Sequence, residues 1–178
     1  GFSGYRGAEL IQILSRHSQA EPVLLEHRDA AAEPRPVGYT GPRRMPCTAE
    51  SVRSAGLQGV FLATAPEISM ELAPGFLDAG AKVVDLSGAF RLGSVENYKR
   101  WYKEEHTAEQ LFGEAVYGLP EFNRAKAVGA RLISNPGCYP TAANLAIRPL
   151  VAAGIVDRHA GIVCDAKSGV SGAGRKAS

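Results

Sequence analysis

The sequence predicts an α/β protein that contains a Rossmann-type, doubly wound parallel sheet. Two stretches, Gly59–Thr64 (GVFLAT) and Lys82–Leu86 (KVVDL), are short and mainly apolar, and helix-like segments separate such stretches along the chain. Strands without regular polar alternation are buried on both faces, and the helices that connect parallel strands cover those faces. A glycine-rich turn before the first helix is the third observation, because dinucleotide-binding sheets carry such a turn.

The composition is that of an ordinary globular chain. At 178 residues it is long enough for one domain, or for one domain and part of another. Hydrophobic residues make up 45% and the net charge is +2, so nothing indicates a nucleic-acid partner. No apolar run approaches the roughly 20 residues of a membrane-spanning helix, so we expect no membrane partner. Three widely spaced cysteines without paired Cys/His spacing favour a reducing, cytoplasmic location without structural zinc.

The chain begins with glycines at intervals of three, Gly1, Gly4 and Gly7, with Ser3 among them, and an amphipathic helix is expected over Ala8–His17. A dinucleotide-binding loop follows a strand and presents its glycines where the next helix begins and a pyrophosphate binds. Because nothing precedes Gly1 in the sequence, we expect the first strand of the sheet to be missing. The alternative is a flexible N-terminal tail that leads into a helix.

A short strand is expected at Pro22–Glu26, and the residues 29–47, rich in Ala, Pro, Gly and Arg, are expected to form a loop. In dinucleotide-binding folds, a residue about 20 positions after the glycines selects the cofactor. Glu26 can bind a ribose 2′-hydroxyl, whereas the guanidinium of Arg28 suits a 2′-phosphate. We favour Arg28, and therefore NADP, because it begins the loop at the expected adenosine end. The alternative for both residues is an ordinary surface charge.

Two further strands are expected in the second half of the chain, at Leu132–Ser134 and at Gly161–Ala166 (GIVCDA). Cys164 falls inside the second apolar pattern, which places it in the core. Cys47 follows a proline in the loop and has no evident partner.

The most informative segment is 132–149 (LISNPGCYPTAANLAIRP), in which an apolar run enters an Asn-Pro-Gly turn. Cys138 then stands in the first turn of a long helix. Free backbone N–H groups and the helix dipole favour negative charge at this end, so they favour a reactive thiolate. The alternative is that Cys138 is a small buried hydrophobe, as many free cysteines are.

Several motifs occur together in one order. They are GFSGYRGAEL at 1–10, DLSGAFRL at 85–92, YGLPE at 117–121, SNPGCYPTAANLAIRP at 134–149 and AKSGVSGAGRKA at 166–177. In these segments, and over essentially its whole length, the chain resembles the N-acetyl-gamma-glutamyl-phosphate reductase family.

The resemblance implies an NADP-binding Rossmann domain over residues 1–135. It also implies the beginning of a semialdehyde-dehydrogenase-type catalytic and dimerisation domain over 136–178, with the chain truncated at both ends. The implied reaction is the NADPH-dependent reduction of N-acetyl-L-glutamyl 5-phosphate to N-acetyl-L-glutamate 5-semialdehyde in arginine biosynthesis, through a thioester on Cys138. The implied partners are a small acyl-phosphate substrate and, in a homo-oligomer, further copies of the chain as a dimer or tetramer.

Residues are assigned to the site from these motifs. Asn135 is expected to position the substrate carbonyl or the cysteine turn, and is equally suited to being a turn residue alone. Arg91 is expected to bind the carboxylate or phosphate of the substrate, with a surface ion pair as the alternative. The loop 168–175 resembles a family segment that reaches back to the cofactor; taken alone, it reads as a mobile loop or tail. The expected cofactor-binding residues are Gly1, Ser3, Gly4, Gly7, Arg28, Ser168, Gly169 and Gly172.

The chain departs from the family pattern in two respects. Gly88 and Ala89 differ from the usual LSADFR-like motif, which puts one polar contact near the active site in doubt. The family's catalytic histidine is expected beyond Ser178, so we expect the 178-residue chain alone to be inactive. Two other functions stay open: a related acyl-phosphate reductase for a carrier-linked amino acid or aspartyl phosphate, and a non-catalytic NADP-binding module. The histidines present, none of which occupies the family motif, are His17, His27, His106 and His159.

Overall fold

Parallel strands form two sheets in this protein. The computed structural model describes residues 1–26, 41–157 and 159–174. The strands in these ranges are β1 (Leu24–Glu26), β2 (Arg44–Pro46), β3 (Gly59–Leu62), β4 (Lys82–Asp85), β5 (Ala115–Tyr117) and β6 (Leu132–Ser134). The larger sheet has the order β3-β4-β6-β5 and the smaller one pairs β1 with β2, and each pairing is parallel.

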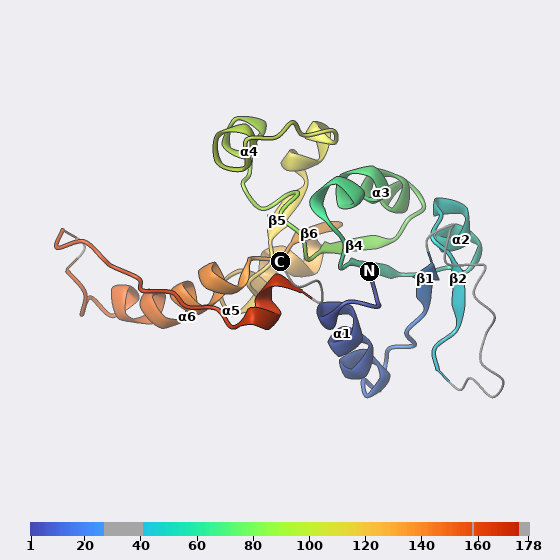
Figure 1. The fold of residues 1–178 in the computed structure, drawn as a ribbon, viewed down its shortest axis with the longest axis horizontal. Coiled ribbons are helices and arrows are strands. Elements are labelled where there is room, and N and C mark those ends of the chain that lie inside the picture. The colour runs from blue at the N-terminus through green and yellow to red at the C-terminus, as the bar shows by residue number, and fades with distance from the viewer. Residues whose placement is uncertain (27–40, 158, 175–178) are drawn as a thin grey trace.

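Helices flank the strands on both sides. They are α1 (Tyr5–Ser15), α2 (Ala49–Ser54), α3 (Pro66–Asp78), α4 (Val95–Tyr102), α5 (Pro120–Gly129) and α6 (Cys138–Ala152), with two short 3-10 segments, η2 (Glu109–Gly113) and η3 (Val170–Ala173). Figure 1 shows α3 and α4 on one side of the strands and α1 and α6 on the other. The predicted α/β fold with a doubly wound parallel sheet is therefore confirmed. In the described part of the chain, no helix has the length and apolar character needed to cross a membrane.

Local sequence explains where several helices begin. The Thr48 side chain accepts a hydrogen bond from the Ser51 N–H at 3.1 Å and caps α2. The Ser94 hydroxyl caps α4 by accepting from the Asn97 N–H at 3.2 Å. Pro66 opens α3, where its fixed φ is already helical and its missing N–H costs no bond.

The hydrophobic core lies between the larger sheet and the helices α2, α3 and α4. Val83 of β4, Leu132 of β6 and Phe76 of α3 are almost fully buried in it. Alternate residues of the apolar runs thus enter the core, whereas the other face of the larger sheet is only partly covered, with Phe61 of β3 41% exposed.

Two predictions about strands were wrong. Residues 29–47 contain β2, which pairs with β1, although residues 27–40 lie outside the described part. Gly161–Ala166 forms no strand, and Cys164 is exposed rather than in the core. An apolar, β-branched segment becomes a strand only where another strand supplies its hydrogen bonds, and no described residues do so here. β5, which the sequence did not reveal, pairs with β6 at the far edge of the sheet.

An apolar cavity of about 340 Å³ separates the smaller sheet from the larger one. Its walls include Leu24 of β1, Val60 of β3, Leu10 and Leu14 of α1, and Phe76 of α3. Within the described residues, β1 and β3 have no strand between them. The cavity lies where an additional strand of a continuous sheet would run, and the expectation of such a strand stays a prediction.

Candidate active site

Segments distant in the sequence meet at the C-terminal ends of the parallel strands. The α-amino group of Gly1 donates to the carbonyl of Ala63, directly after β3. The guanidinium of Arg6, in the first turn of α1, donates to the carbonyl of Leu86 at 2.7 Å, directly after β4. Doubly wound sheets bind their ligands at this edge. The beginning of α1 therefore lies where a Rossmann-type fold places its nucleotide.

The three N-terminal glycines form a compact turn that leads into α1. The N–H of Gly4 donates to the carbonyl of Gly1 at 3.2 Å, and Gly4 precedes the helix without a side-chain cap. Gly7 is buried, and a Cβ there would come within 2.5 Å of the Gly1 carbonyl oxygen. Ser3 is exposed within the turn. Gly4 supplies no side-chain cap to α1, and a helix start of this kind favours an anion.

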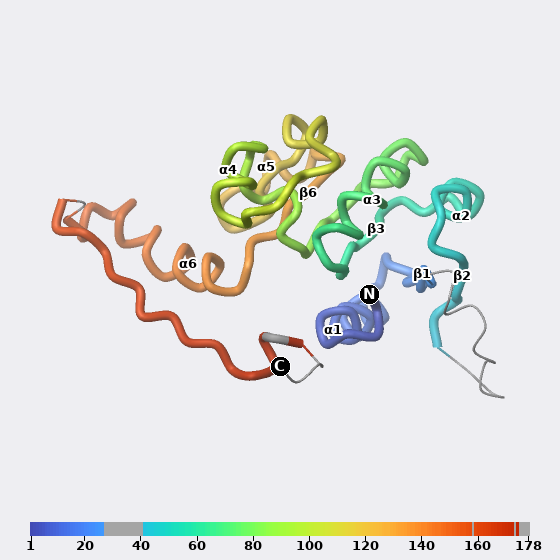
Figure 2. The backbone as a smooth tube through the Cα atoms, turned by 45° about the horizontal axis from the view of Figure 1, so that its top comes forward, coloured from blue at the N-terminus to red at the C-terminus, as the bar shows by residue number. Residues whose placement is uncertain are grey.

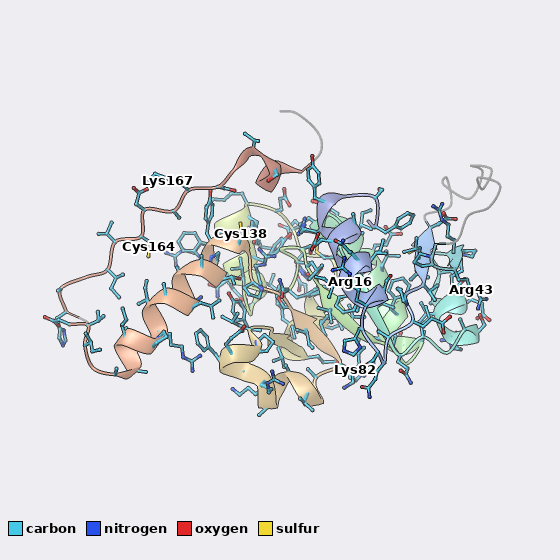
Figure 3. The ribbon with its side chains drawn as sticks, turned by 90° about the horizontal axis from the view of Figure 1, so that it is seen from below. Arg16, Arg43, Lys82, Cys138, Cys164 and Lys167 are labelled. Atoms are coloured by element: carbon cyan, nitrogen blue, oxygen red, sulfur yellow. The ribbon has the colours of Figure 1, made fainter. Side chains whose placement is uncertain are left out.

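Cys138 is the first residue of α6, and its side chain is exposed. The helix starts there because Gly137 is extended, with φ −72° and ψ 167°, and its carbonyl accepts the first helical bond from the Thr141 N–H at 3.0 Å. Pro140 fits in the first turn, where its missing N–H leaves no bond unmade. Figure 3 shows Cys138 at the end of α6 nearest the sheets. The alternative of a buried small hydrophobe is thus wrong.

Asn135 connects the cysteine turn to the sheet. Its backbone N–H donates to the carbonyl of Asp85 at 2.8 Å, which continues the pairing of β6 with β4 beyond the last strand residue. Its side-chain amide donates to the carbonyl of Pro136 at 3.1 Å, so the side chain stabilises the turn. The amide oxygen has no partner among the described residues and remains an acceptor for a ligand.

Arg91 reaches the cysteine turn from the loop that follows β4. Its Nη2 donates to the carbonyl of Ser87 and, at 3.4 Å, to that of Leu86. Its Nη1 lies 3.0 Å from the place where Gly137 would carry a Cβ. Within the described residues Arg91 forms no ion pair, in contrast to the surface-pair alternative. The guanidinium therefore lies beside the residue that precedes Cys138.

The buried carboxylate of Asp85, which was not among the expected site residues, shapes the loop that carries Arg91. Asp85 is fully buried at the end of β4, and its two carboxylate oxygens accept from the N–H and the hydroxyl of Ser87, at 3.0 and 2.9 Å. The Ser87 hydroxyl in turn accepts from the N–H of Ala89 at 3.0 Å. An acidic residue at the end of an apolar strand, with Ser-Gly two and three positions later, was the signal that could have revealed this turn.

The later expected cofactor residues lie on an extended segment that follows α6. Ser168 and Gly169 are exposed, and the Ser168 hydroxyl donates to the Gly169 carbonyl at 3.2 Å. Gly172 lies in η3. Figure 2 shows α6 running away from the sheets and this segment running back toward α1, as does Figure 1. The segment thus returns toward the glycine turn, but no described hydrogen bond joins the two.

Of the two residues considered for selecting the cofactor, Glu26 and Arg28, the structure describes only Glu26. Arg28 lies outside the described residues. Glu26, at the end of β1, is bonded to Arg44 of β2 at 2.8 Å, so its carboxylate already has a cationic partner. This ion pair crosses the smaller sheet and explains part of the pairing of these short strands.

His106 is enclosed on the side of α4. Its Nδ1 accepts from the Ala108 N–H at 3.2 Å, and its Nε2 lies 3.0 Å from the Ala89 carbonyl. Because a carbonyl only accepts, the two contacts together specify a neutral ring with the proton on Nε2. The rings of Phe90, Tyr98 and Phe112 surround it. His106 is therefore buried and supports the loop that carries Arg91.

A parallel doubly wound sheet, a glycine turn at one helix start and a cysteine at another define a nucleotide-binding α/β protein with a thiol at the ligand edge of its sheet. The chain belongs to the semialdehyde dehydrogenase family. The model of the semialdehyde dehydrogenase NAD binding domain matches residues 1–130. The model of the semialdehyde dehydrogenase dimerisation domain matches residues 138–178 and begins at the cysteine.

Curated relatives resemble the chain over nearly its whole length. An N-acetyl-gamma-glutamyl-phosphate reductase of Thiobacillus denitrificans is 45% identical over 99% of this chain and 53% of the relative. Reductases of the same name from Symbiobacterium thermophilum and Escherichia coli are 44% and 45% identical, over 98% and 99% of this chain and 51% and 56% of the relatives. The chain therefore spans about half the length of the curated relatives it matches.

Proposed function

We propose that this chain supplies the dinucleotide site and the reactive thiol of an NADPH-dependent acyl-phosphate reductase. Its substrate is N-acetyl-L-glutamyl 5-phosphate and its product N-acetyl-L-glutamate 5-semialdehyde, in arginine biosynthesis. The observation that carries this proposal is the exposed Cys138 at the start of α6, with the Arg91 guanidinium beside the preceding residue. The names of the relatives supply the substrate.

The glycine turn fits a dinucleotide. The uncapped start of α1 offers backbone N–H groups to a pyrophosphate, and the absence of a side chain at Gly7 lets the turn close tightly. Gly1, Ser3 and Gly4 would hold the pyrophosphate, Arg28 a 2′-phosphate, and the 168–172 segment the nicotinamide end. The bound cofactor would supply a hydride to a carbonyl held at the cysteine.

The helix start gives Cys138 its chemistry. The exposed sulfur of Cys138, at the beginning of α6, attacks the carbonyl carbon of the acyl phosphate as a thiolate. The C–S bond forms, the bond from that carbon to the phosphate oxygen breaks, and phosphate leaves with the bonding electrons. With hydride supplied to the thioester carbon by a bound cofactor, the sulfur of Cys138 would leave with the electrons of the C–S bond and the aldehyde would be released. Arg91 neutralises the departing phosphate, and Asn135 orients the carbonyl.

The remaining expectations belong to the same proposal. Residues 1–135 act as the dinucleotide-binding domain, and 136–178 begin the catalytic domain. The match of 138–178 to a dimerisation domain supports a homo-oligomer in which that region contributes to the interface. The free cysteines Cys47, Cys138 and Cys164 fit a reducing compartment, which supports a cytoplasmic location.

The test uses the complete gene product with purified acyl phosphate and NADPH. We expect Cys138→Ser to lower turnover about a thousandfold or more, because a hydroxyl is a far weaker nucleophile. The matched control is Cys164→Ser, an exposed cysteine on the segment after α6, which should retain full activity. Without NADPH, mass spectrometry should detect the acyl group on the Cys138 peptide. Turnover that survives Cys138→Ser would refute the proposal.

The same assay separates the alternatives. Faster turnover of a carrier-linked acyl phosphate or of aspartyl phosphate than of the N-acetylglutamyl compound assigns the protein to a related reductase. Binding of NADPH without turnover of any of the three acyl phosphates indicates a non-catalytic module.

A further inference from the structure

We propose that Arg6 and Arg91 together form a binding site for a phosphoryl group, in which Arg6 is a second cationic ligand. The inference rests on the proposed function only for the source of that group. The carbonyl of Leu86 accepts from both side chains, from Arg6 Nη1 at 2.7 Å and from Arg91 Nη2 at 3.4 Å. The two guanidinium groups are thus no farther apart than two hydrogen bonds to one oxygen allow.

The position of the pair suits an anion that takes part in the reaction. Arg6 belongs to the first turn of α1, which has no side-chain cap from Gly4, and Arg91 lies against Gly137 at the start of α6. Two helix N-termini and two guanidinium groups therefore converge at the end of β4. Both helix dipoles and both side chains favour negative charge at this point.

The bonding of the two side chains leaves donors free for a ligand. A guanidinium carries five N–H donors, and Arg6 uses one of them in its bond to Leu86. The Nε of Arg91 is buried and has no acceptor among the described residues. Within the described part of the chain, neither guanidinium has a carboxylate within ion-pair distance. The nearby Asp85 carboxylate is occupied by Ser87.

These features define the class of ligand. Two adjacent cations repel each other, and a doubly charged tetrahedral anion relieves that repulsion. Paired N–H groups of a guanidinium match two phosphoryl oxygens, which makes a phosphoryl group the best fit. The group can come from the acyl phosphate, with inorganic phosphate as its product, or from the pyrophosphate of the cofactor.

The experiment titrates inorganic phosphate and, separately, NADPH into the complete gene product by calorimetry. Arg6→Gln and Arg91→Gln are each expected to weaken inorganic phosphate binding about tenfold, as for loss of a charged hydrogen bond. The double variant should lose less than the product of the two single losses, because the residues share one ligand. Arg16→Gln, which removes a guanidinium at the other end of α1, is the matched control and should bind phosphate normally.

The outcomes are distinct. If phosphate binding is unchanged but NADPH binding weakens about tenfold, the pair binds the phosphoryl group of the cofactor. If Arg6→Gln changes neither titration, the inference is overturned. Arg6→Lys retains the charge and should retain part of the affinity, and a thermal melt checks that each variant is folded. Since phosphate binding needs no turnover, the inference survives a protein without reductase activity and fails separately from the proposed function.

Discussion

The terminal nitrogen Nη1 of Arg91 lies 3.0 Å from the point at which a side chain on Gly137 would place its Cβ. Gly137 has φ −72° and ψ 167°, which any residue adopts, so its backbone does not require glycine. A side chain here would be in tight contact with the guanidinium of Arg91, which would have to move by a few tenths of an ångström. The loop after β4 and the turn after β6 are thereby fitted to each other beside Cys138.

This contact predicts the effect of Gly137→Ala. The added methyl group should displace the guanidinium and lower kcat/KM of the complete gene product about tenfold, since small displacements in an active site are costly. The unfolding free energy should fall by about 1 kcal/mol, because alanine is a poorer N-cap residue than glycine. Steady-state kinetics and chemical denaturation measure the two effects.

Two comparisons control this prediction. Gly129→Ala, at the end of α5, places a methyl group in open space and should leave kcat/KM unchanged. In an Arg91→Gln background, Gly137→Ala should have little further effect, because the displaced group is already absent. An equal loss with and without Arg91 would show that the methyl group acts by another route.

Gly7→Ala should disturb the turn that leads into α1. The new Cβ would lie 2.5 Å from the Gly1 carbonyl oxygen and from Phe2 Cα, which are backbone atoms and cannot rotate away. The turn must open, at a cost of about 1–3 kcal/mol in unfolding free energy. NADPH should bind about tenfold more weakly, measured by fluorescence titration. Gly113→Ala, which meets nothing within 4 Å, should be close to neutral; similar losses in both variants would contradict the prediction.

The burial of His106 predicts that the protein becomes less stable at acidic pH. Burial lowers the pKa of His106 from its ordinary value of 6.5, and the hydrogen bond to the Ala89 carbonyl and the charge of Glu109 oppose this only in part. The unfolded chain therefore binds a proton more readily than the folded one. The stabilisation is fully present above about pH 6.5 and is lost as the pH falls through that value toward the lower pKa of the folded state.

Urea denaturation between about pH 8 and pH 5 measures this dependence. Replacement His106→Gln should make the unfolding free energy less dependent on pH in this window. His17→Gln, at an exposed position, should leave the dependence as it is in the unaltered protein. If the His106 variant loses stability with pH as steeply as the unaltered protein, another group is responsible.

The cavity between the sheets predicts that an added strand stabilises the protein. The amino group of Gly1 lies at the C-terminal end of β3, so a segment fused ahead of it would run parallel to β3. About five apolar, β-branched residues there should fill the space between β1 and β3 and raise the Tm by about 2–4 °C for each kcal/mol gained. A fusion of equal length made of Lys and Glu should not, and equal melting temperatures for both fusions would reject the prediction.

Sequence patterns predicted four strands, β1, β3, β4 and β6, and missed β2 and β5. β3, β4 and β6 lie within the apolar runs from which they were expected, and in each of them alternate residues are buried in the core. β2 and β5 have three residues each and bury little, so their sequences carry no comparable signal. The expected strand Gly161–Ala166 has the right composition but no partner among the described residues. A segment forms a strand only when another strand lies beside it, and the segment's own sequence does not show whether such a partner exists.

The candidate site, too, was predicted from the sequence only in part. The Asn-Pro-Gly turn placed Cys138 at the start of its helix, since turn chemistry and helix capping depend on adjacent residues. The meeting of Arg6 and Arg91 at the Leu86 carbonyl was not evident, because it depends on where α1 lies relative to β4. The sequence by itself determined four of the strands, the cysteine turn and the family motifs. Only the tertiary structure decided which distant side chains share one edge of the sheet, because strand order is set by the packing of the whole core.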